Sequence, residues 1–178
     1  FRFSTRFGVN VGFGYQRNNN NTQWFGNFAD STGRTHYSFA HLNQRTVSMS
    51  TRVNYTFTPN LTFEFWGQPF VSTGTYSDVR EVSATPDADE YDDRFDPYTP
   101  AANANMHFKF TQLRTNSVVR WEYRPGSTVF VVWQHGRQGD GSTSPQNMRQ
   151  SWTRDYRELF SVHPHNTFLI KVAYWLNR

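Results

Sequence analysis

The chain of 178 residues is long enough to bury one hydrophobic core, and its aromatic content of 18% is too high for a disordered protein. No apolar run approaches the roughly 20 residues of a membrane helix, which excludes a helical membrane protein. The net charge of +4 comes from scattered basic residues and predicts no nucleic-acid partner, and the absence of cysteine excludes disulfides and thiolate metal sites.

The first predicted strand covers Phe1–Tyr15, where Phe, Val and Tyr alternate with Arg, Ser, Gly and Asn. Because successive strand residues point to opposite faces, one face of this strand is apolar and the other is polar. The small residues on the polar face suit a curved sheet with a polar interior. A turn is expected at 18–21, a short strand at 23–28 and a loop signal after it.

Four further strands follow the same alternation, and they are joined in pairs by tight turns at 58–60 and 124–126. They are expected at 46–57, from Leu61 to about Gln68, at 106–123 and at 127–134. The apolar parity of 106–123 changes near Leu113, which predicts a β-bulge or the exit of the strand from a membrane. A short helix over 154–162 and a last strand over 166–176 complete the prediction.

Short connections at 18–21, 58–60 and 124–126 contrast with long loops at 30–44, 78–105 and 138–165. This asymmetry is typical of outer-membrane barrels, which have short periplasmic turns and long extracellular loops. We therefore predict an all-β fold for 1–178, a single antiparallel transmembrane β-barrel region of about seven strands. With the short turns in the periplasm the first strand begins outside, so the chain is expected to form the C-terminal part of a larger barrel.

Five stretches of the chain resemble one family of bacterial outer-membrane-type proteins of unknown function: Tyr37–Thr46, Tyr55–Phe63, Gly67–Ser72, Arg120–Ser127 and Phe168–Trp175. The run Arg-Trp-Glu-Tyr-Arg-Pro-Gly-Ser at 120–127 is the most specific of them. Longer members of that family join an N-terminal domain similar to carbohydrate-binding module family nine to a C-terminal barrel region. The resemblance implies a barrel in the outer membrane of a Gram-negative bacterium, and it supplies no catalytic residues.

Charged residues recur on the polar faces of the predicted strands and are candidates for the lining of a barrel lumen: Arg2, Arg6, Arg52, Glu64, Arg120, Glu122 and Lys171. On a pore wall such charges would tune ion selectivity. The alternative is that they only solvate the wall, because a lumen is polar whether or not it conducts.

The loop at 78–105 concentrates carboxylates that form a weak candidate for calcium: Asp87, Asp89, Glu90, Asp92, Asp93 and Asp96. Hard cations such as Ca²⁺ bind several carboxylate oxygens at close range, but the spacing matches no complete calcium loop. A solvated loop is the alternative reading. No other cofactor is expected.

Together these patterns predict an outer-membrane β-barrel protein, a porin-like channel or a surface-binding scaffold, without enzymatic activity. Its expected partners are membrane lipid and lipopolysaccharide, together with barrel strands from the rest of the protein or from partner chains. No Gly-x-Ser-x-Gly motif or phosphate loop is present. Two alternatives stay open: a soluble β-sandwich that binds glycans, and a barrel hydrolase with its site in the long loops.

Overall fold

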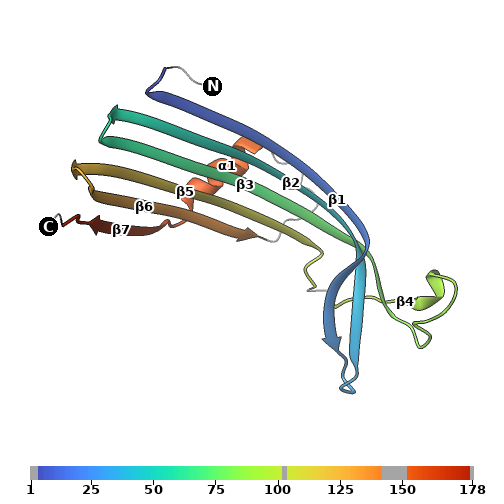
Figure 1. The fold of residues 1–178 in the computed structure, drawn as a ribbon. Helices are drawn as coiled ribbons and strands as arrows, with labels where there is room; N and C mark the ends of the chain where they lie inside the picture. Colours follow the sequence, from blue (N-terminus) through green and yellow to red (C-terminus); the bar gives the residue numbers. More distant parts are fainter. Residues whose placement is uncertain (1–3, 102–103, 142–151, 177–178) are drawn as a thin grey trace.

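The computed structural model describes residues 4–101, 104–141 and 152–176, and nearly all of its regular structure is one antiparallel sheet (Figure 1). The sheet has seven strands: β1 (Phe7–Ala29), β2 (Thr35–Thr58), β3 (Leu61–Val82), β4 (Phe95–Pro97), β5 (His107–Arg124), β6 (Ser127–Gly141) and β7 (His165–Ala173). Their order is β1-β2-β3-β5-β6-β7, and the short β4 pairs with the end of β3. The helices are α1 (Trp152–Ser161) and a 3₁₀ turn at Asp92–Arg94.

The antiparallel all-β prediction is confirmed, but the sheet is not closed into a barrel. Strands β1 and β7 form its two edges, and within the described residues they do not pair with each other. Bacterial outer-membrane barrels contain eight or more strands. The six long strands of this sheet are too few to close by that rule.

Strand β1 corrects the predicted turn at 18–21, because it continues through the asparagine run to Ala29. Asn18, Asn19 and Asn20 pair in register with residues 42–44 of β2. The backbone ladder of this long hairpin therefore outweighs the low strand propensity of asparagine. Register shifts follow between Asn20 and Gln23 and between Trp24 and Gly26, and the far ends of β1 and β2 bend away from the rest of the sheet there (Figure 1).

The prediction of a long loop over 30–44 is also wrong, since the chain turns within 30–34 and β2 begins at Thr35. Likewise β3 extends to Val82 and β6 to Gly141, which shortens the connections expected at 78–105 and 138–165. The helix expected at 154–162 is present as α1, while 142–151 lie outside the described residues.

One end of the sheet carries the tight turns at 59–60 and 125–126, and the start of β1 and the end of β7 lie there too (Figure 1). We call it the short-turn end and the opposite one the long-connection end. The prediction that the first strand begins among the long loops is therefore wrong, because it depended on the false turn at 18–21.

The register gives the sheet two unlike faces. A continuous row crosses every long strand on what we call the apolar face: Phe7, Tyr55, Phe63, Val119, Val131 and Ile170. The next row toward the long-connection end contains Val9, Val53, Phe65, Ser117, Trp133 and Phe168. We call the opposite side the polar face; it carries Gly, Ser, Asn, Gln and charged side chains, although Val118 and Val132 lie opposite each other on it.

The bulge predicted near Leu113 is absent, since β3 and β5 pair without interruption from Leu61 and Trp121 to Thr75 and His107. The apolar side chains change face for another reason. Phe110 contacts Phe70, with ring centroids 5.3 Å apart, and Phe108 contacts Tyr76 at 5.9 Å, all on the polar face. Aromatic pairing on that face therefore explains the change of parity.

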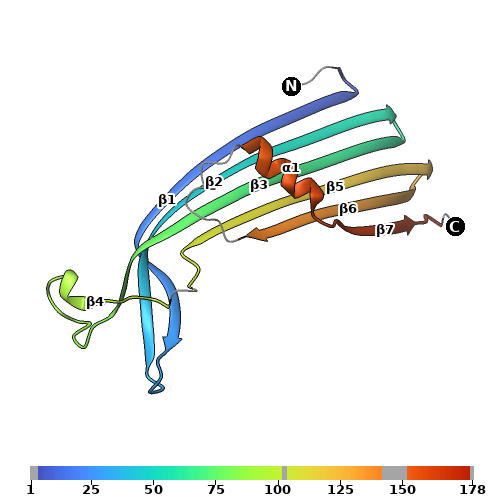
Figure 2. The same ribbon diagram turned by 180° about the vertical axis from the view of Figure 1, so that it is seen from behind.

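Helix α1 lies across one face of the sheet and contacts β3, β5 and β6 (Figure 2). The face is the apolar one, because Glu158 of α1 binds Lys109 at 3.0 Å and Arg137 donates to the Val162 carbonyl at 2.8 Å. Leu159 is only 1% exposed. Buried apolar side chains on the same face of the sheet are Val47, Val71 and Leu113. Among the described residues, no helix is both long and apolar enough to cross a bilayer.

Candidate functional site

The structure places most of the predicted lumen charges on the polar face. Strand register puts Arg52, Glu64, Arg120 and Lys171 there, with Glu122 two residues beyond Arg120. Arg6 lies before β1, where its carbonyl accepts a hydrogen bond from the Thr56 N–H at 2.8 Å. Arg2 lies outside the described residues. The alternation of polar and apolar residues therefore predicted correctly that these charges share the polar face. Their role in lining a lumen stays a prediction.

Most of these charges stand apart from one another. Arg120 and Glu122 form an ion pair at 3.2 Å, and within the described part of the chain the other predicted charges form none. Glu122 also accepts a hydrogen bond from the Gly126 N–H at 3.0 Å. The Arg120–Glu122 pair therefore belongs to the β5–β6 turn as much as to the face.

Neutral amides and hydroxyls fill the polar face between the charges. The Gln44 side chain accepts from Asn18 at 3.4 Å and donates to the Ser72 hydroxyl at 2.9 Å, and Ser72 also bonds to Thr46 at 2.8 Å. Trp66 borders two neighbouring depressions, one of about 430 Å³ with Asn116 and Gln134 and one of about 370 Å³ with Asn10 and Arg52. The polar face therefore presents many groups that can form hydrogen bonds with water.

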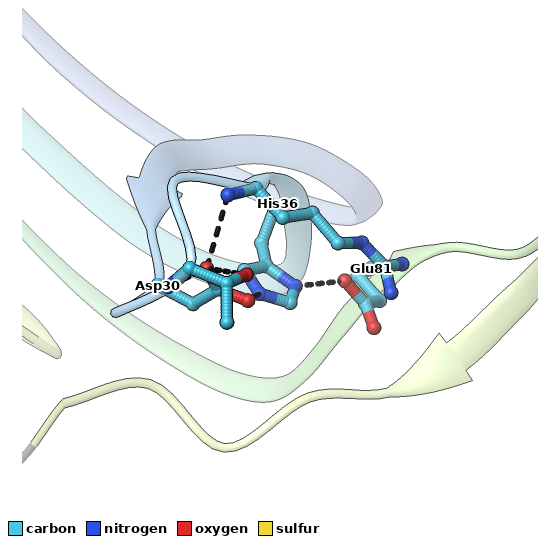
Figure 3. A network of polar contacts seen from close by, with 5 residues as sticks. Asp30, His36 and Glu81 are labelled. Atoms are coloured by element: carbon cyan, nitrogen blue, oxygen red, sulfur yellow. Dashed lines mark hydrogen bonds and ion pairs between the residues drawn. The ribbon is translucent and has the colours of Figure 1, made fainter.

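A separate polar cluster lies at the long-connection end, where His36 of β2 stands between two carboxylates (Figure 3). Its Nδ1 contacts the Glu81 carboxylate of β3, and its Nε2 lies 3.4 Å from the Asp30 carboxylate in the β1–β2 turn. The Tyr98 ring stacks on the imidazole, with centroids 5.1 Å apart. The cluster therefore joins the β1–β2 turn, strands β2 and β3, and the segment between β4 and β5.

Hydrogen bonding accounts for the electrostatics of this cluster. The bond to Glu81 raises the pKa of His36 above its ordinary 6.5, because the carboxylate stabilises the imidazolium. The Thr32 hydroxyl, which donates to Asp30 at 2.7 Å, and the N–H groups of Thr32 and Arg34 lower the pKa of Asp30 to about 2. The arrangement is a charged clamp, and sequence reasoning missed it because His36 and Glu81 are 45 residues apart.

The acidic loop forms an open depression of about 640 Å³, whose lining includes Asp87, Asp89, Asp92, Asp93 and Asp96. Within the described residues, no three His, Asp or Glu side chains are grouped closely enough to hold a metal ion. Calcium binding by this loop stays a prediction that the structure does not support.

The apolar face is a chemically uniform surface. Phe13, Phe168 and Ile170 are 76%, 69% and 69% exposed. Other strongly exposed apolar side chains on this face are Val11, Tyr15, Met49, Tyr55, Trp121, Val131, Trp133 and Val172. Exposed apolar patches of this extent mark an interaction with another protein, a lipid phase or a ligand.

The sequence profile of a family described as a domain of unknown function (DUF5916) matches residues 1–177. The chain belongs to the DUF5916 family. Neither a curated protein nor a solved structure matches it.

Within the described residues of this DUF5916 chain, the candidate functional surfaces include the apolar face, the polar face, the His36 clamp and the acidic loop. Alternation in the sequence revealed the first two, since it specifies the two faces of a strand directly. The only sequence signal for the clamp was the turn chemistry of Asp30, Thr32 and Gly33, whose φ of 83° suits glycine.

Proposed function

We propose that this chain is part of the wall of an outer-membrane β-barrel, with the apolar face toward lipid and the polar face toward an aqueous lumen. The barrel would act as a channel or as a scaffold for surface binding, and we assign the chain no catalytic role. The observation that carries the proposal is the apolar face, whose rows continue across all six long strands. Outside the part that α1 covers, it exposes large apolar side chains on β1, β2, β5, β6 and β7.

The height of the apolar rows supports this proposal. On β1 the apolar residues run from Phe7 to Tyr15, and on β2 the matching residues run from Val47 to Tyr55. At roughly 3.3 Å per residue each run spans about 26 Å. A tilted transmembrane strand has about 9–11 residues, so the nine residues of each run are within the range needed to cross the apolar band of an outer-membrane barrel.

The exposed edges of the sheet support it as well. Edge strands with free backbone groups promote further pairing, and a barrel is the arrangement that removes such edges. Strand β1 runs toward the long-connection end and β7 runs away from it. An antiparallel barrel that contains this sheet is therefore completed by an even number of added strands, from the rest of the protein or from partner chains.

The experiment that tests the proposal is extraction and gel migration of the protein expressed in a Gram-negative host. We expect the chain to sediment with outer membranes, to require detergent for extraction and to change its gel migration on boiling. A monomer that stays in solution without detergent would contradict the proposal and favour the β-sandwich, in which a further layer covers the apolar face.

A further inference from the structure

A row of basic residues lies just beyond the apolar rows, on the same face and toward the long-connection end. Arg17 of β1 pairs with Arg45 of β2, Arg45 pairs with Thr73 of β3, and Thr73 pairs with Lys109 of β5. The nearest row on the short-turn side is that of Tyr15, Val47 and Val71. On this face the last apolar row and the basic row are therefore immediate neighbours.

The pair Arg17–Arg45 is unusual because two like charges stand directly opposite each other. Like charges in this arrangement destabilise a sheet. Lys109 has a counter-ion in Glu158 at 3.0 Å, but among the described residues neither arginine side chain forms a hydrogen bond or an ion pair. Both side chains are exposed. An anion between the two guanidinium groups would remove their repulsion.

The position of the pair relative to the apolar rows indicates the source of that anion. Arg17 lies two residues beyond Tyr15, about 7 Å farther along the strand at roughly 3.3 Å per residue. Aromatic residues such as Tyr15 occupy the interface of a bilayer, and the next layer outward contains the phosphates of the head groups. A guanidinium can bind a phosphate through two parallel hydrogen bonds.

We infer that Arg17 and Arg45 form a binding site for the phosphate of a lipid head group at the edge of the apolar face. The inference rests on the proposed function, since it needs the apolar face in a bilayer. The occupant is a phosphorylated lipid of the leaflet at the long-connection end. In an outer membrane this is the leaflet that contains lipopolysaccharide, whose lipid anchor is phosphorylated.

The test uses the full chain, folded in a zwitterionic detergent and titrated with diphosphoryl lipid A, with bound lipid counted by native mass spectrometry. The double variant Arg17→Gln/Arg45→Gln is compared with Arg52→Gln/Arg114→Gln, which removes the same charge from the polar face. We expect about 30-fold weaker lipid A binding for the first variant, roughly 5-fold for each arginine, and less than a 2-fold change for the second.

Two further measurements separate the outcomes. Heat-modifiable migration and insertion into phosphatidylcholine vesicles show whether each variant is folded in a bilayer. If the wild-type chain inserts and the Arg17/Arg45 variant binds lipid A as well as wild type, the inference fails while the proposed function stands. If neither the wild-type chain nor either variant inserts into the vesicles, both the inference and the proposed function fail. If inorganic phosphate at millimolar concentration displaces lipid A completely, the site is a general anion site and the lipid assignment is wrong.

Discussion

Glu122 accepts a hydrogen bond from the backbone N–H of Gly126 at 3.0 Å, across the turn that joins β5 to β6. The same carboxylate pairs with Arg120 at 3.2 Å, so one side chain connects the strand to its turn. Gly126 has a φ of 77°, a conformation that glycine adopts without strain. The stretch 120–127 therefore forms a local hairpin structure.

We expect Glu122→Ala to lower the free energy of unfolding by about 1 kcal/mol, because it removes a charge-assisted hydrogen bond at a partly exposed site. Glu64→Ala is the matched control and should change it by less than about 0.5 kcal/mol, since Glu64 is exposed and forms no ion pair among the described residues. Urea unfolding in detergent measures both, and equal losses would contradict the role of Glu122 in the turn.

Two adjacent residues of β7 test whether the apolar face contacts lipid and the polar face contacts water. Ile170 and Leu169 are 69% and 57% exposed, on the apolar and the polar face respectively. In a bilayer Ile170→Arg should cost about 1–2 kcal/mol, less than the roughly 2–4 kcal/mol of an arginine at the midplane, because Ile170 shares its row with Phe7 near the short-turn end of the apolar run. Leu169→Arg should cost less than about 1 kcal/mol. Reversible urea folding into vesicles measures both; equal effects of the two changes would argue against lipid on the apolar face.

Helix α1 supplies a packing test on the same face. Leu159 is 1% exposed, whereas its neighbour Phe160 is 60% exposed. Leu159→Ala should therefore lower the free energy of unfolding by about 2–5 kcal/mol, the usual range for a buried leucine. Phe160→Ala, the control, should lower it by less than about 1 kcal/mol. If limited proteolysis near α1 is unchanged in the Leu159 variant, the helix does not depend on this contact.

The His36 clamp predicts a pH dependence at the long-connection end. Because the pKa of His36 is raised, its contribution is complete below about pH 6.5 and is lost as the pH rises through the raised value. The contribution of Asp30 is present above its ordinary pKa of 3.8 and is lost as the pH falls toward about 2. Amide exchange within 30–34 should therefore be slowest between these limits.

The matched variant for this prediction is His36→Gln, which keeps a hydrogen-bonding side chain but removes the titration. Its exchange rates, corrected for intrinsic pH dependence, should no longer change on the alkaline side, while the acid limb set by Asp30 should persist. An alkaline limb identical to that of the wild type would show that His36 is not the group responsible.

Sequence alternation predicted the faces of the strands correctly, because a period of two is a local property. It failed at Asn18–Asn21, where turn-forming residues are held in β1 by their pairing with β2. It also failed at 35–44, which were assigned to a loop but pair with β1 and β3. The His36–Glu81 contact could not be predicted, since it depends on the register of β2 against β3 and on the shift between Phe39 and His41.

The most direct test of the account compares two tryptophans on opposite faces. Trp133 lies on the apolar face, stacked on Phe168, and Trp66 lies on the polar face beside Arg52. Single-tryptophan variants folded into vesicles with brominated acyl chains should show strong quenching for Trp133 and little for Trp66. Aqueous iodide should quench in the opposite order. If the brominated lipid quenches neither tryptophan, or quenches Trp66 more than Trp133, the proposed orientation in the membrane is wrong.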